Sequence, residues 1–107
     1  MSNGSHPTQK YWFGARAPEH AVAWFDFYRS VSKEGVLDRK TKELIAVASG
    51  ALSRCEHCIR AHAKNALGAG ASKEEVAEAV MVASKTASGA QLFWTSVYDE
   101  VLGGEEG

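Results

Sequence analysis

Apolar residues that recur every three or four positions run through most of this 107-residue chain, and this spacing most restricts its fold. Such spacing places apolar side chains on one face of an α-helix, whereas a half-buried strand would alternate them every second residue. No strand-like alternation continues beyond a few residues. We therefore expect an all-α fold, a compact bundle of about five helices. The clearest apolar faces comprise Trp24, Phe27, Tyr28 and Val31, and then Val76, Val80, Ala83, Ala87, Ala90, Trp94, Val97 and Val101.

Start and stop signals divide the first half of the chain into two helices. Pro18 suits the first turn of a helix, where its missing N–H costs nothing, and Gly35 is expected to end that helix. Asp38 is a candidate N-cap for the next helix. Residues 44–53 of that helix carry no charge, so we expect it to be central and buried.

Further signals surround the two cysteines of the chain. Ser53 and Glu56 have the Ser-x-x-Glu spacing of a capping box, which predicts a helix start with Cys55 in the first turn. Gly68 and Gly70 are stop signals for the far end of that helix.

The last long segment opens with a second capping box, formed by Ser72 and Glu75. It is either one helix of about thirty residues or two helices broken near Gly89, since a glycine costs roughly 1 kcal/mol relative to alanine inside a helix. We expect one domain over residues 1–107, with its ordered core at about 18–102.

The N-terminus has a different character. Residues 1–10, MSNGSHPTQK, are polar and turn-rich, and we expect a flexible arm; because the GSH within it also occurs in cloning remnants, His6 is given no role. The following YWFGARAP contains three adjacent aromatics, which are more typical of packing against a neighbouring helix or subunit than of an exposed tail.

Composition argues against several classes of partner. The 12 Lys and Arg residues balance 13 Asp and Glu residues without a basic stripe, which argues against nucleic acid. There is neither an apolar run of about 18 residues nor a signal segment, so we expect no membrane partner and a cytoplasmic location. A chain of this size buries only about two-thirds of its unfolded surface, so we expect a homo-oligomer.

The stretch RCEHCIRAH, residues 54–62, carries the chemistry. In a reducing cytosol a C-x-x-C pair is more often catalytic or metal-binding than a permanent disulfide. On a helix, Cys55, Cys58 and His62 share a stripe about 60° wide, whereas His57 falls on the other side. The start of a helix favours a thiolate at Cys55. His62 is one turn from Cys58, close enough to take its proton.

Three interpretations of these residues stay open on the sequence alone: a redox pair, a metal site, and plain packing of small cysteines in a core. Structural zinc sites usually take ligands from two separate segments, and only one cluster exists here; nothing in the sequence brings His20 near it. Glu43 stands at the entrance to the uncharged run. It is a candidate for acid–base chemistry, with a solvated helix-start carboxylate as the alternative.

The combined pattern E-x11-C-x-H-C-x3-H, from Glu43 to His62, resembles the signature of alkyl hydroperoxidase D-like proteins of the carboxymuconolactone decarboxylase superfamily. The flanking stretches VLDRKTKELIAVASGALSRC and AKNALGAGASKEEVAEAV resemble that family too. The resemblance covers roughly residues 18–102.

The resemblance implies an all-helical fold in trimeric or hexameric assemblies and a thiol-dependent peroxidase cycle. A hydroperoxide would oxidise Cys58, Cys55 would close a redox-active disulfide with it, and an external dithiol, either a dihydrolipoyl group or a thioredoxin-like protein, would reopen the bond. His62 and Glu43 would form a proton relay, with His57 in support. No bound cofactor and no metal are expected. The alternatives are lactone decarboxylase chemistry and a non-catalytic metal-binding or redox-sensing module.

Overall fold

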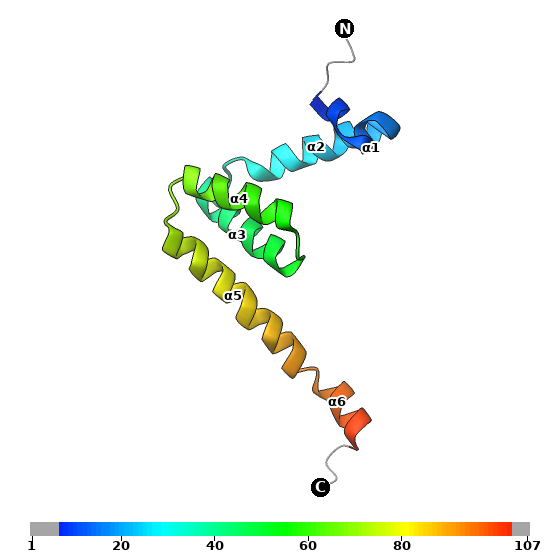
Figure 1. The fold of residues 1–107 in the computed structure, drawn as a ribbon, viewed down its shortest axis with the longest axis vertical. Helices are drawn as coiled ribbons and strands as arrows, with labels where there is room; N and C mark the ends of the chain where they lie inside the picture. Colours follow the sequence, from blue (N-terminus) through cyan, green and yellow to red (C-terminus); the bar gives the residue numbers. More distant parts are fainter. Residues whose placement is uncertain (1–6, 104–107) are drawn as a thin grey trace. The chain divides into compact units, whose positions relative to one another are not determined.

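The computed structural model describes residues 7–103, and within this range every regular element is a helix, which confirms the all-α prediction (Figure 1). Five of the α-helices have eight residues or more. None of the described helices is long and apolar enough to cross a membrane. The elements in chain order are η2 (Pro7–Lys10), α1 (Trp12–Arg16), α2 (Pro18–Ser32), α3 (Arg39–Leu52), α4 (Glu56–Gly68), α5 (Lys73–Leu92) and α6 (Thr95–Leu102).

Internal contacts divide the chain into two compact units, one up to Asp38 and one from Arg39 onward. In the first unit η2 and α1 pack against each other and against α2. Of the arm expected over residues 1–10, residues 1–6 lie outside the described part, whereas Pro7–Lys10 form a short 3-10 helix. Thr8 is buried there, and a Cβ on Gly14 would lie 1.8 Å from the Thr8 carbonyl oxygen, so only glycine fits.

Aromatic stacking joins the start of this unit to α2. The Tyr11 and Phe13 rings stack on Phe25 of α2 with centroids 5.2 and 6.0 Å apart, a contact of the kind expected for the YWF cluster. Helix α2 begins at Pro18 as predicted, but it ends at Ser32 and not at Gly35. The reason is local, because Lys33 already has extended backbone angles.

In the second unit α3 packs against both α4 and α5. Helix α3 begins at Arg39, directly after the predicted N-cap Asp38. The expectation of a fully buried central helix is wrong for the single chain. Glu43, Val47 and Gly50 are buried along one stripe, whereas Ile45 is 50% exposed, because only one side of α3 meets other helices.

Helix α5 starts with the predicted capping box, in which the Ser72 hydroxyl accepts from the Glu75 N–H and the Glu75 carboxylate accepts from the Ser72 N–H. The same carboxylate also accepts from Lys40 of α3 at 3.0 Å. The last segment is two helices, and the break lies at residues 93–94, not near Gly89. Gly89 stays helical because its propensity cost of roughly 1 kcal/mol does not by itself end a helix, and its carbonyl accepts from the Phe93 N–H.

Candidate active site

The turn between α3 and α4 places the cysteines. The Arg54 N–H donates to the Ala51 carbonyl and the Cys55 N–H donates to the Gly50 carbonyl, which is the hydrogen-bond pattern of a Schellman motif at the end of α3. Such a motif needs one left-handed residue, usually glycine. Here Arg54 takes that position, with a φ of 56°, and its conformation turns the chain into α4.

This turn corrects the predicted capping box at Ser53 and Glu56. Helix α4 begins at Glu56, and its N-cap is Cys55, whose Sγ accepts a hydrogen bond of 3.1 Å from the Cys58 N–H. Ser53 is still tied to α3 through its N–H to Ser49, so it cannot cap α4. Cys55 therefore lies one position outside the first helical turn in which it was predicted.

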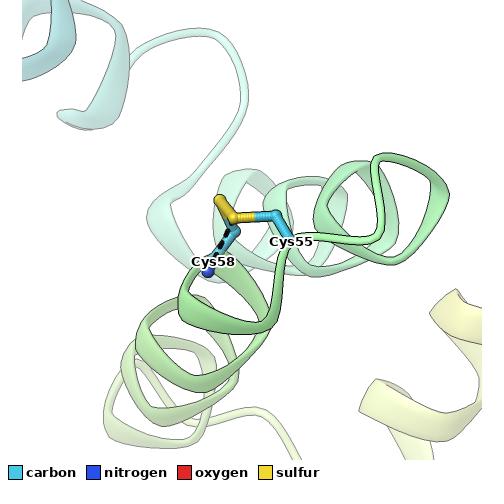
Figure 2. The surroundings of a disulfide bond; sticks show 2 residues. All are labelled: Cys55 and Cys58. Carbon is cyan, nitrogen blue, oxygen red and sulfur yellow. Dashed lines mark hydrogen bonds between the residues drawn. A yellow bond between two sulfur atoms is a disulfide. The ribbon is translucent and has the colours of Figure 1, made fainter.

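Cys55 and Cys58 form a disulfide at the start of α4, with Cα atoms 5.2 Å apart (Figure 2). Both residues are half-buried. The dashed line in Figure 2 marks the amide hydrogen bond onto the Cys55 sulfur. The pair is thus accessible, and its first sulfur lies where a helix N-terminus stabilises negative charge.

A close contact with α3 holds the disulfide in place. A Cβ added to Gly50 would lie 3.0 Å from the Cys58 Cβ and 3.4 Å from the Ile59 backbone nitrogen, so α4 approaches α3 here as closely as a glycine permits. The sequence analysis missed Gly50. Its one signal was that it is the only glycine within residues 44–53.

Glu43 and His62 come together from two different helices. The Glu43 Oε1 lies 2.7 Å from the His62 Nδ1, and their side chains are only 6% and 16% exposed. His62 is also one turn along α4 from Cys58. In the tautomer whose Nδ1 donates to the carboxylate, Nε2 is the ring nitrogen that carries no proton.

The other histidines considered are not part of this hydrogen-bonded pair. His57 is exposed in the first turn of α4 and is not joined to Glu43 or His62. His20 belongs to the first unit, on α2. Within residues 7–103 no three His, Cys, Asp or Glu side chains are grouped as metal ligands would be.

Comparison with known proteins identifies the family of the chain. The model of the Carboxymuconolactone decarboxylase family matches residues 18–96, which include both cysteines, Glu43 and His62. The chain belongs to the carboxymuconolactone decarboxylase family. The match crosses the boundary between the two units, so this family's sequence pattern draws on both.

Individual proteins are similar to the chain over shorter stretches. A protein described as uncharacterized protein 4 in the cox locus of Paracoccus denitrificans is 40% identical over 68 residues, covering 64% of this chain and 61% of that protein. Alkyl hydroperoxide reductase AhpD of Corynebacterium aurimucosum is 39% identical over 61 residues, covering 57% of this chain and 34% of that protein. The chain thus matches between about a third and three-fifths of the length of these curated relatives.

A family fold has also been observed by crystallography. The crystal structure of a protein from Methanobacterium thermoautotrophicum aligns with a TM-score of 0.75 at 37% sequence identity. The alignment covers 80% of this chain and 97% of that chain, so it spans nearly the whole of the solved protein.

Proposed function

We propose that this chain is a thiol-dependent hydroperoxidase that cycles between a Cys55–Cys58 dithiol and disulfide. The observation that carries the proposal is the hydrogen bond between Glu43 and His62, placed one helical turn from a cysteine pair that forms a disulfide. A buried carboxylate that orients an imidazole beside a thiol is the arrangement that activates a nucleophile. The similarity to an alkyl hydroperoxide reductase supports the same chemistry.

The proposed cycle has three chemical steps. His62 takes the proton of Cys58, and the thiolate attacks the terminal oxygen of the hydroperoxide, giving an alcohol and a sulfenic acid on Cys58. Cys55 then attacks that sulfur, water leaves, and the disulfide forms. An external dithiol finally reduces the disulfide by two electrons and is itself oxidised to a disulfide.

The position of Cys55 at the start of α4 suits it to the second step, the attack on the Cys58 sulfenic acid. Because its sulfur accepts the Cys58 N–H in the structure, a thiolate on Cys55 would be stabilised by the N-terminus of α4 while it waits for the sulfenic acid. Cys58 lies inside the helix, nearer in sequence to His62, which makes it the thiol that His62 can deprotonate.

A coupled assay with dihydrolipoamide and an organic hydroperoxide tests the function. Wild-type protein should consume peroxide catalytically, and Cys58→Ser should reduce the rate to that of the uncatalysed reaction. Equal and slow consumption by the two proteins would refute the proposal. Activity on a carboxymuconolactone that survives thiol alkylation would replace it with decarboxylase chemistry, and stoichiometric zinc in protein purified without chelator would indicate a metal-binding module.

Glu43→Gln tests the proton relay separately. Glutamine keeps a hydrogen bond to His62 but cannot stabilise its protonated ring, so we expect the peroxidase rate to fall by about tenfold to a hundredfold. The shape of the rate-against-pH profile should change as well, which a merely structural role would not cause. Glu74→Gln, which removes an exposed carboxylate at the start of α5, is the matched control and should leave the profile as it is.

A further inference from the structure

The carboxylate of Glu43 shares α3 with cations that lie close to it along the helix. Helical spacing places Arg39 and Lys40, four and three positions earlier, on the face that contains Glu43. Lys42 lies about 100° away around the helix. Arg39 and Lys42 have contacts of their own, and Arg39 is exposed, whereas Lys40 is half-buried. Lys40 is therefore the cation best placed to compete with His62 for the carboxylate.

The hydrogen bond between Glu43 and His62 is open to that competition. It joins Oε1 of the carboxylate to Nδ1 of the imidazole, so Oε2 is the oxygen that a cation would reach. The Glu43 side chain is only 6% exposed, and solvent screens charges weakly in such a position. A cation paired with Glu43 would weaken the attraction of the carboxylate for His62 and would disfavour the protonated ring.

In the structure Lys40 pairs with a different carboxylate, that of Glu75 at the start of α5. The Lys40 ammonium donates to Oε2 of Glu75 at 3.0 Å. The other carboxylate oxygen, Oε1, accepts from the Ser72 N–H at 2.9 Å, and the Ser72 hydroxyl accepts from the Glu75 N–H. The capping box thus fixes Glu75 at its backbone and at its side chain, and each carboxylate oxygen has its own partner.

Glu75 is also a carboxylate that keeps its charge. The hydrogen bond from the Ser72 N–H, and after it the hydrogen bond and the charge of Lys40, lower the pKa of Glu75 from its usual value of 4.5. The carboxylate therefore stays ionised at neutral pH and attracts the Lys40 ammonium throughout that range.

We propose that Glu75 is a positioning residue for the proton relay, because it holds the Lys40 ammonium away from Glu43. The Glu43 carboxylate is thereby kept for His62. This inference rests on the proposed function, in which His62 takes the proton of Cys58. Of the two helices packed against α3, α4 presents His62 to this part of it and α5 presents Glu75. When Glu75 loses its charge, Lys40 turns to Glu43 and His62 becomes a weaker base.

The protonation of His62 tests this proposal without any peroxide, through the NMR chemical shifts of its ring across a pH series with the disulfide intact. In Glu75→Gln the ring should become protonated at a pH about half a unit lower than in wild type, the size of effect that one partly exposed ion pair gives. Lys40→Gln removes the competing cation, so its ring should become protonated at the wild-type pH or above it. The double variant Lys40→Gln/Glu75→Gln should return to the wild-type value.

The peroxidase reaction provides a second readout. The acidic limb of the rate-against-pH profile should move to lower pH in Glu75→Gln, by the same amount as the protonation of His62, and should return in the double variant. Glu74→Gln, an exposed carboxylate beside Glu75, is the matched control and should change neither measurement.

The variants separate positioning from a structural role. Lys40→Gln and Glu75→Gln break the same ion pair, so an equal fall in the pH of His62 protonation in both would overturn the proposal. Wild-type protonation of His62 in Glu75→Gln would overturn it as well. If His62 follows the expected order but the wild-type protein consumes no peroxide, the proposed function fails, whereas the hold of Glu75 on Lys40 stands.

Discussion

At the scale of single residues, three positions on the α3–α4 corner determine where the sulfurs lie. Arg54 reverses the chain, Cys55 ends one helix and caps the next, and Gly50 lets the second helix approach the first. These positions are linked, since the Cys55 N–H donates a hydrogen bond to the Gly50 carbonyl. A change at any of them is therefore expected to move the disulfide.

Gly50→Ala tests the close approach. Alanine gains about 0.5–1 kcal/mol from helix propensity, but crowding of a packed site costs about 1–3 kcal/mol. Because the new Cβ would lie 3.0 Å from the Cys58 Cβ, the second effect should prevail, and urea denaturation should show a net loss of about 1 kcal/mol. Gly89→Ala is the matched control, since nothing lies within 4 Å of its Cβ position, and it should gain stability. A stable Gly50→Ala protein would contradict the close contact.

At the scale of helices, the contacts of α3 with its two neighbours assemble the second unit. Glu43 faces His62 of α4, and Lys40, one turn earlier, pairs with Glu75 of α5. The first pair is buried, whereas the second is partly exposed. Helix α3 therefore provides one residue of the candidate proton relay, Glu43, and one residue of the ion pair at the start of α5, Lys40.

Glu75→Gln should weaken the second unit in a pH-dependent way. The Ser72 N–H, and after it the Lys40 ammonium, hold the pKa of Glu75 below its usual value of 4.5. A lowered pKa in the folded state means that the carboxylate contributes stability above about pH 4.5, and this contribution is lost as the pH falls through the folded-state pKa. The urea midpoint of Glu75→Gln should thus lie below wild type at pH 7 and approach it at pH 3.5. The difference in urea midpoint between Glu74→Gln and wild type should be the same at both pH values. If that difference also shrinks at pH 3.5, the Lys40 and Ser72 contacts do not cause the pH dependence of Glu75→Gln.

At the scale of the whole molecule, the apolar surface is the dominant feature. Within the described residues the buried apolar side chains are those of four alanines and one valine, Ala21, Ala66, Ala71, Ala83 and Val47. Burial is worth only about 0.8 kcal/mol per methylene, so these small side chains stabilise a fold weakly. Meanwhile Trp12, Leu92, Phe93 and Trp94 are each more than 60% exposed.

We expect these exposed side chains to be covered by other copies of the chain. Light scattering at micromolar concentration should give a multiple of 11.5 kDa, as in the trimer or hexamer implied by the resemblance. Phe93→Lys should lower that mass, because Phe93 is 79% exposed and lies at the turn between α5 and α6. Glu78→Lys, a polar exposed position on α5, should leave it unchanged. A wild-type mass of 11.5 kDa would refute assembly.

Local pattern predicted much of this protein. Apolar spacing predicted the helices, Pro18 marked a start, and the box at Ser72 and Glu75 formed as expected. These features depend on neighbours within one turn, so they can be inferred from the sequence. The predicted box at Ser53 did not form because the Ser53 N–H still bonds to Ser49 of α3. Gly89 did not break α5 because its propensity cost is too small to end a helix by itself.

The one-turn spacing of Cys58 and His62 could be inferred from the amino-acid sequence alone, because helical geometry relates positions on one helix directly. The contact of Glu43 with His62 and the close approach of Gly50 to Cys58 depend on how α3 packs against α4, so local spacing could not predict them. The reason is the left-handed conformation of Arg54, which sets how α4 returns along α3. A conformation that disfavours its own residue type cannot be inferred from local preference, and here it decides where the disulfide lies.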